Sequence, residues 1–310
     1  MMTTLLLSHD SGLRHVTPPG HPERADRLRA VMAVLEDESF SALAREPAPE
    51  ADLETIIRVH PAEYVEALRE AVPAEGMVRV DADTSLSSGS WEPILRAAGG
   101  AVQAVDEVME GKVSNAFLAM RPPGHHAETS TPMGFCFLNN AAIAARHARA
   151  RHGAERVAIV DFDVHHGNGS QDIFWSDANV MYCSTHEMPL YPGTGARTER
   201  GAHNNVVNAP LSAGDGGPEF RDAMSSVILP RADEFRPDLI VISAGFDAHM
   251  RDPLANLNLV EADYTWITQK LMEIADRHAS GRIVSVLEGG YDLEGLSRSV
   301  AAHVKALMRG

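Results

Sequence analysis

Apolar runs of four or five residues recur along the chain, and most are followed by polar residues and then by a helical pattern. Apolar runs without polar alternation are typical of strands buried on both faces of a parallel sheet. We predict seven such strands, at residues 5–8, 56–61, 116–120, 157–165, 180–183, 239–243 and 283–287. The segment from Glu46 to Glu54 is rich in Pro, Ala and acidic residues and predicts a loop.

Between these runs, apolar residues recur every three or four positions, which indicates helices with one buried face. Pro22 is expected to open the first helix, and further helical patterns cover residues 64–68, 94–105, 139–151, 220–228, 264–274 and 296–304. Strands that alternate with helices predict a parallel sheet covered on both faces. Because no composition shift or long linker divides the chain, we predict a single α/β domain over residues 1–310.

Composition narrows the class of protein without identifying it. The chain has 310 residues, 44% hydrophobic, enough for a large core, and it lacks an apolar run long enough to span a membrane. Its first residues do not resemble a signal peptide. The formal charge of -16 argues against nucleic-acid binding. With two cysteines, Cys136 and Cys183, no disulfide framework is expected, so we predict a reducing, cytoplasmic setting. The oligomeric state stays open, a homo-oligomer included.

One stretch, residues 157–169, combines a buried strand with charged side chains. Four apolar residues lead into Asp161, Asp163 and His165, which alternate with Phe162 and Val164. On a strand, alternate side chains lie on the same face, so the three polar groups share one side. Two carboxylates and an imidazole are costly to bury unless a cation compensates their charge. The pattern therefore predicts a metal site.

Other predicted strands also end in polar residues, and parallel strands bring these ends to one edge of the sheet. Asp163, His165 and Asp247 form an oxygen and nitrogen ligand set with room for water, the arrangement of a catalytic zinc. Iron(II) and cobalt remain alternatives. A two-metal site would need a carboxylate where Gly167 stands, so we expect one ion.

Two further strand ends supply groups for acid–base chemistry. His125 and His126 are adjacent in a turn made rigid by two prolines and a glycine, where one imidazole could act as a base. Tyr291 follows two glycines and could donate a hydrogen bond to a carbonyl oxygen. Cys136 and Cys183 lie in apolar runs and are expected in the core, so no covalent intermediate is predicted.

These motifs together resemble the zinc-dependent histone deacetylase and acetylpolyamine amidohydrolase family, and class II and bacterial members more than class I. The resemblance covers nearly the whole chain. It rests on His-Pro-Glu-Arg at 21–24, Arg-Pro-Pro-Gly-His-His-Ala at 121–127, Gly-Phe-Cys-Phe-Leu-Asn-Asn at 134–140, Asp-Phe-Asp-Val-His-His-Gly-Asn-Gly at 161–169, Pro-Gly-Thr-Gly at 192–195, Gly-Phe-Asp-Ala-His at 245–249 and Glu-Gly-Gly-Tyr at 288–291.

The resemblance implies a three-layer α/β/α fold with a mainly parallel eight-stranded sheet, the arginase–deacetylase fold. It implies zinc on the three ligands named above, His126 as general base and acid, and His125 as its charge-stabilising neighbour. Asp161 would orient His125, and Asn168 would orient His126. Class I members carry Asp at the position of Asn168, so His126 should be less basic here.

The resemblance also implies a substrate tunnel and structural potassium. Gly134, Phe135 and Tyr191 would form the tunnel wall, with Leu254 at the rim. Potassium would bind near Asp161 and Ser184, and at backbone carbonyls near Phe174 and Val180.

The implied activity is removal of an acetyl or other short acyl group from an amine on an extended chain. The substrate could be acetyl-lysine in a protein, an acetylpolyamine or another small amide. A polyamine enzyme should carry a carboxylate at the tunnel mouth, and Glu128, Glu187 and Asp252 are candidates. A different class of function, a non-catalytic module that binds acyl-lysine, would require the loss of a ligand or catalytic group, yet all are present.

Overall fold

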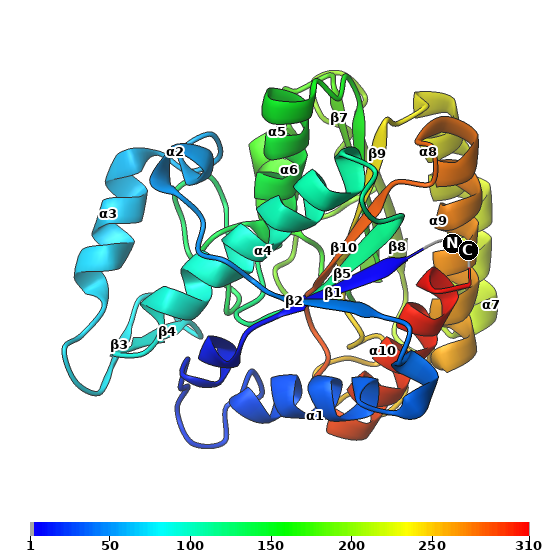
Figure 1. Ribbon diagram of the computed structural model, residues 1–310. Coiled ribbons are helices and arrows are strands. Elements are labelled where there is room, and N and C mark those ends of the chain that lie inside the picture. Colours follow the sequence, from blue (N-terminus) through cyan, green and yellow to red (C-terminus); the bar gives the residue numbers. More distant parts are fainter. Residues whose placement is uncertain (1–2, 310) are drawn as a thin grey trace.

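A computed structural model describes residues 3–309, which form one large sheet between two layers of helices (Figure 1). The eight strands pair in parallel throughout, in the order β2-β1-β5-β10-β9-β6-β7-β8. They are β1 (Thr4–Ser8), β2 (Ala44–Pro47), β5 (Asn115–Ala119), β6 (Val157–Asp161), β7 (Val180–Glu187), β8 (Val206–Leu211), β9 (Leu239–Ala244) and β10 (Ile283–Leu287). A separate antiparallel pair consists of β3 (Met77–Arg79) and β4 (Ser85–Ser87).

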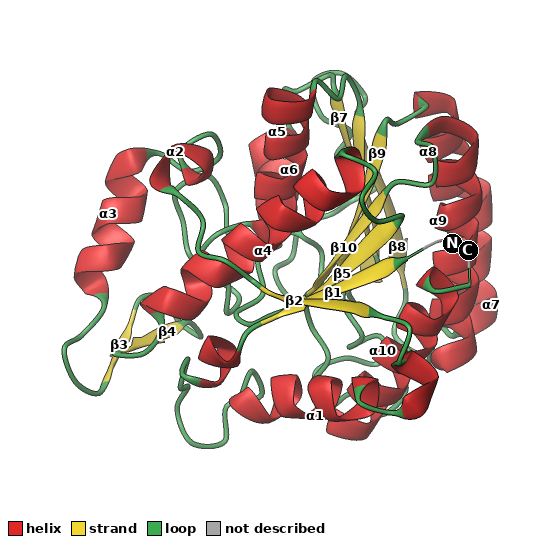
Figure 2. Cartoon of the chain, viewed as in Figure 1, coloured by secondary structure: helices red, strands yellow, loops and turns green. Residues whose placement is uncertain are grey.

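Helices cover both faces of the sheet, as Figure 2 shows. One face carries α2 (Leu53–Ile56), α3 (Ala62–Ala71), α4 (Trp91–Met109), α5 (Asn140–His152) and α6 (Asn168–Phe174). The other carries α1 (Ala25–Leu35), α7 (Gly217–Ala223), α8 (Leu229–Phe235), α9 (Glu261–His278) and α10 (Leu293–Leu307). A π-helical turn at Met224–Ile228 joins α7 to α8, and short 3-10 turns lie at Asp10–Leu13 and Glu38–Phe40. The predicted three-layer fold is confirmed.

Two hydrophobic cores, one on each face, hold the layers together. Alternate residues of one strand contribute to different cores: Val160 packs into the core beneath α9 and α10, whereas Ile159 packs into the core beneath α4 and α5. Because both faces of the inner strands are buried, these strands are largely apolar, which explains the apolar runs in the sequence. Among the described residues, no helix is both long and apolar enough to cross a membrane.

Some predicted elements were wrong. The run at 56–61 is not a strand: Asp52 caps the short helix α2 by accepting a hydrogen bond from the backbone N–H of Thr55 at 2.6 Å. The first long helix begins at Ala25 rather than at Pro22. Part of the segment predicted as a loop at 46–54 belongs to the edge strand β2.

Candidate functional site

The end of β6 places three polar side chains on one side of the backbone, as the alternation predicts. Phe162 and Val164 point into the core under α9. On the opposite side, His165 Nδ1 lies 3.2 Å from Oδ1 of Asp163 and 3.1 Å from Oδ2 of Asp247, which follows β9. All three side chains are buried. The predicted ligand set therefore comes together from two neighbouring strands.

The spacing of these atoms suits a bound ion. Ligand atoms on a tetrahedral zinc lie about 3.3 Å apart, given bonds of about 2.0–2.1 Å. The remaining carboxylate oxygens are held by the backbone: Asp163 Oδ2 accepts a hydrogen bond from the N–H of Gly289 at 2.8 Å, and Asp247 Oδ1 accepts one from the N–H of Val164 at 2.9 Å. These bonds orient the free oxygens toward His165.

The charges of this group call for a cation. Burial alone would lower the pKa of His165, but hydrogen bonds and charges from Asp163 and Asp247 raise it to about 10. Burial and the negative charge of Asp163 raise the pKa of Asp247 to about 7. Without an ion, a proton on the imidazole would offset only part of the charge of the two carboxylates. A divalent ion would displace that proton and supply the charge instead, so the residues fit a metal.

A second group of similar composition does not show this spacing. On α4 and α5, Nε2 of His147 and Nε2 of His152 lie 2.7 and 2.6 Å from the same oxygen of Asp106. These are hydrogen-bond distances, shorter than the separation of ligands around an ion, and Asp106 is partly exposed. Within residues 3–309, the His165 group, which is wholly buried, is therefore the better candidate for a metal site of the two.

The two adjacent histidines face different partners. His125 Nδ1 lies 2.9 Å from Oδ2 of Asp161, which also accepts a hydrogen bond from the hydroxyl of Tyr182 at 3.0 Å. His126 Nδ1 lies 2.8 Å from Oδ1 of Asn168. The two ring centroids are 4.1 Å apart. Each predicted pairing of histidine and partner is therefore present in the geometry.

Their surroundings shift the two pKa values in opposite directions. Burial opposes protonation of His125, but Asp161, Asp163 and Glu288 outweigh it and raise its pKa well above the ordinary value. Burial and the positive charge of His125 lower the pKa of His126 well below the ordinary value. His126 is thus the imidazole with a free lone pair near neutral pH.

Sequence reasoning missed the supporting contacts of two glutamates, although it named Glu128 as a candidate carboxylate at the tunnel mouth. Glu288 Oε2 accepts hydrogen bonds from the backbone N–H groups of Gly124 and His125, at 2.7 and 3.1 Å, and so fixes the histidine turn. Glu128 Oε1 accepts a hydrogen bond from Nδ2 of Asn168 at 2.8 Å, which turns the amide oxygen of Asn168 toward His126. Both glutamates lie within or beside the quoted motifs, but the sequence does not indicate which residue an acidic side chain at these positions contacts.

A cavity of about 240 Å³ leads to these groups. Its walls are Asp83, His126, Gly134, Phe135, His165, Leu190, Tyr191, Leu254 and Tyr291. The four residues predicted for the substrate tunnel all line it, whereas Asp83 and Leu190 were not predicted. Gly134 has a φ of 55°, and a Cβ there would lie 2.4 Å from the His126 ring, so the close approach requires glycine.

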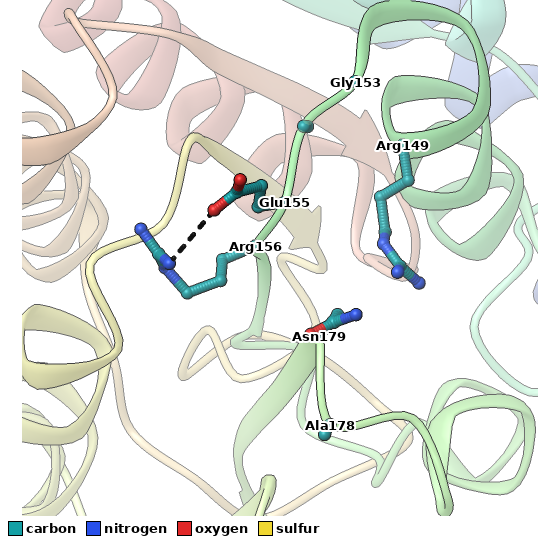
Figure 3. Close-up of a pocket in the computed structure, with 7 residues that line it drawn as sticks. Arg149, Gly153, Glu155, Arg156, Ala178 and Asn179 are labelled. Carbon is teal, nitrogen blue, oxygen red and sulfur yellow. Dashed lines mark ion pairs between the residues drawn. The ribbon is translucent and has the colours of Figure 1, made fainter.

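A larger cavity, about 430 Å³, lies at the opposite end of β6 (Figure 3). It is lined by Arg149, Gly153, Ala154, Glu155, Arg156, Ala178 and Asn179, and within it Arg156 pairs with Glu155 at 3.6 Å. Its walls hold charged and small side chains and no imidazole, thiol or tyrosine. The smaller cavity, which reaches two histidines and a tyrosine, is therefore the better candidate for chemistry.

The residues predicted to hold potassium lie at two positions with different chemical surroundings. Asp161 and Ser184 are paired residues of β6 and β7, and Asp161 brings a buried carboxylate to that position. The carbonyls of Phe174 and Val180 instead accept hydrogen bonds from Nδ2 of Asn205, at 2.8 and 3.0 Å. As arranged, this second pair does not fit a cation.

Comparison with known proteins identifies the family of this chain. Residues 21–307 match the family model of the histone deacetylase domain. A probable deacetylase of Archaeoglobus fulgidus is 40% identical over all of this chain and 87% of its own length. A histone deacetylase-like amidohydrolase of Pseudomonas aeruginosa is 40% identical over 89% of this chain and 74% of its own. The crystal structure of the HDA15 HD domain aligns with a TM-score of 0.94 at 37% identity, over 100% of this chain and 90% of that one.

A parallel eight-stranded sheet between two helical layers, with its site at the carboxyl ends of the strands, defines the arginase–deacetylase fold. Within that fold, the chain belongs to the histone deacetylase family, in its bacterial type, and is a hydrolase of that family.

Proposed function

We propose that the chain acts as a single zinc-dependent deacetylase domain that removes an acetyl or other short acyl group from an amine, such as that of acetyl-lysine. The observation that carries the proposal is the 240 Å³ cavity, in which His126, His165 and Tyr291 meet at the end of a largely apolar passage. A passage of this kind suits the methylene chain of an acylated lysine.

Zinc would be held by Asp163, His165 and Asp247, where it would act as a Lewis acid toward the amide carbonyl and lower the pKa of a water molecule. The spacing of the ligand atoms and the negative charge of the two carboxylates support this assignment.

Proton transfer is assigned to His126. Its lowered pKa leaves the ring neutral, so that it can take a proton from the attacking water. It then gives that proton to the amine nitrogen as the carbon–nitrogen bond breaks, which yields a carboxylic acid and a free amine. His125, held by Asp161, stabilises negative charge next to the base.

Tyr291 is assigned to the developing oxyanion. Burial raises the pKa of its hydroxyl well above the ordinary value, so the group stays protonated and remains a hydrogen-bond donor. Its ring is fixed at the cavity wall, where Phe135 packs edge-on at 5.8 Å and the Arg27 guanidinium lies 4.8 Å from the ring centroid. A donor held in this way stabilises charge without reorganising.

An acetylpolyamine is the alternative substrate, and one carboxylate at the cavity supports it. Glu187 is engaged by Asn256, and Asp252 accepts backbone hydrogen bonds from Leu254 and Tyr291; neither carboxylate lines the cavity. Glu128 is engaged by Asn168. Asp83 does line the cavity; its Oδ1 accepts hydrogen bonds from the N–H of Gly134 at 3.2 Å and from the hydroxyl of Thr84 at 2.8 Å, which leaves Oδ2 for a distal ammonium.

The test is turnover by metal-depleted protein titrated with zinc. We expect hydrolysis of a fluorogenic acetyl-lysine peptide to rise and saturate near one zinc per chain. Binding of the peptide without turnover at saturating zinc would instead indicate a non-catalytic module. Acetylputrescine, compared with a neutral acetamide of equal length, tests the polyamine alternative. A preference for acetylputrescine that disappears in Asp83→Asn would favour that substrate.

The cellular setting is also a proposal. Cys136 and Cys183 are both buried and unpaired, which supports a reducing compartment such as the cytoplasm. One relative, from Arabidopsis thaliana and 38% identical over 98% of this chain, is named as chloroplastic, so a chloroplast is the alternative setting.

A further inference from the structure

Three backbone carbonyls converge on one side-chain nitrogen between α6 and β7. Nδ2 of Asn205 lies 2.8 Å from the oxygen of Phe174, 3.1 Å from that of Asp177 and 3.0 Å from that of Val180. The three carbonyls belong to successive turns, because Asp177 N–H donates to Phe174 and Val180 N–H donates to Asp177. We call this group the carbonyl cage. Asn205 itself is 3% exposed.

Backbone carbonyls that surround a single point are the ligands that replace the hydration shell of potassium. The family resemblance places a potassium ion at Phe174 and Val180, in this cage. Here the point where the oxygens meet is taken by the NH2 group of an amide, whose two protons carry partial positive charge. We propose that the carboxamide of Asn205 replaces a structural cation in this protein.

Charges around the cage favour a neutral donor over a cation. Two arginines of α5 flank it: Arg149 lies 2.8 Å from the side chain of Asp177, Arg146 contacts the same carboxylate, and the Arg146 guanidinium lies 4.8 Å from the centroid of the Phe174 ring. Two positive charges are thus opposed by one carboxylate. This charge weakens the attraction of the carbonyls for a potassium ion but does not act on a neutral amide, so the amide is the better occupant where the two compete.

The orientation of the amide follows from its neighbours. If the amide were turned round, its protons would face the N–H of His203, and the three carbonyls would lose this donor. On its other side, Oδ1 of Asn205 accepts a hydrogen bond from the N–H of His203 at 3.4 Å. The network therefore assigns the nitrogen to the cage.

The position near Asp161 and Ser184 differs because it holds a buried carboxylate, so a cation there stays compatible with the structure. The two potassium positions implied by the family should then behave differently: the first binds an ion and the second does not. This inference depends on the fold and not on the substrate, so failure of the proposed deacetylase activity would leave it standing.

Thallium, which stands in for potassium and scatters strongly at anomalous wavelengths, tests the native protein directly. Crystals of the metal-loaded native protein grown in a thallium salt should show no anomalous peak among the carbonyls of Phe174, Asp177 and Val180. A peak there, with the Asn205 amide turned away, would overturn the proposal.

Thermal unfolding of variants tests the cage itself. Asn205→Ala should unfold at a lower temperature than the native protein in choline chloride. At equal ionic strength in potassium chloride it should recover by a few degrees more than the native protein does. Asn208→Ala is the matched control, because Asn208 is a buried asparagine of β8, the strand that follows Asn205, and its Nδ2 bonds mainly to the side chain of Gln171 at 2.8 Å.

The control should lose stability without any extra gain from potassium. If Asn205→Ala also shows no extra gain, the carbonyls do not form a cation cage and the proposal is wrong. Should Asn205→Ala fail to fold, Asn205→Ser, which removes the amide but keeps a polar group, takes its place in the same comparison.

Discussion

His125 Nδ1 lies 2.9 Å from Oδ2 of Asp161, whereas the neighbouring His126 meets the uncharged amide oxygen of Asn168. A carboxylate favours the protonated imidazole and an amide does not. The two adjacent rings are therefore held in different protonation states, and the pKa of His126 is lowered further by the charge on His125. This difference assigns the base.

We expect His126→Ala to reduce kcat by about 10²–10⁴-fold, the loss typical of a missing general base. His125→Ala should reduce kcat less. Both variants should retain zinc, since neither histidine belongs to the proposed ligand set. Steady-state kinetics together with metal analysis checks both points. A larger loss in His125→Ala would reverse the assignment.

The hydroxyl of Tyr291 gives a second prediction. Tyr291→Phe removes one donor to the oxyanion but leaves the ring that packs against Phe135. We expect kcat to fall by about 10²–10³-fold, with KM changed far less. Tyr191→Phe is the control, because Tyr191 lines the same cavity but has no assigned part in proton or charge transfer. A kcat within about threefold of native for Tyr291→Phe would exclude the hydroxyl from the transition state.

Removal of a ligand should remove the metal. Asp247→Ala deletes one of the two carboxylates that face His165, so the protein should lose zinc on dialysis and lose activity with it. Asp106→Ala, from the group with hydrogen-bond spacing on α4 and α5, should keep one zinc per chain. Stoichiometric zinc and full activity in Asp247→Ala would remove Asp247 from the ligand set.

Zinc binding should also release protons. In the metal-free protein the pKa of His165 is raised to about 10, so at pH 7 its ring carries a proton that a metal must displace. The affinity for zinc should therefore fall as the pH falls. Calorimetric titrations at pH 7 in buffers of different ionisation enthalpy should report the release of at least one proton per zinc. A binding enthalpy independent of the buffer would contradict this.

The sequence predicted the six inner strands of the sheet and missed the two at its edges. Inner strands are buried on both faces, so their apolar runs are unbroken. At one edge, β2 is mostly exposed and reads Ala-Arg-Glu-Pro, and at the other, β8 is interrupted by Asn208 and Pro210. Edge strands tolerate proline and charge, which removes the pattern used to find strands. The count of eight came only from the family resemblance.

In the site, too, the residues at strand ends could be predicted, whereas contacts between segments distant in the sequence could not. The ligand set and the histidine turn were predictable because each lies at the end of a strand, and parallel strands bring such ends together. The contacts of Glu288 with the histidine turn and of Asn205 with the carbonyl cage join segments far apart in the chain. Nothing in the residues themselves indicates those partners, so only the folded structure could provide them.

The last prediction concerns the partner of the base. In Asn168→Asp, a carboxylate would lie where the amide oxygen now faces His126, and its negative charge would raise the pKa of that imidazole. His126 would then stay protonated to higher pH. Because the base must be unprotonated to accept a proton from water, the acidic limb of the pH–rate profile should move to higher pH.

Glu128 would oppose part of this change, because it bonds to Nδ2 of Asn168 and would face the new carboxylate. The double variant Asn168→Asp with Glu128→Gln relieves that repulsion and serves as the control. Both variants should show the shift of the acidic limb, and the double variant should show it without loss of thermal stability. An unchanged profile in both, with zinc retained, would mean that the protonation of His126 does not set the acidic limb.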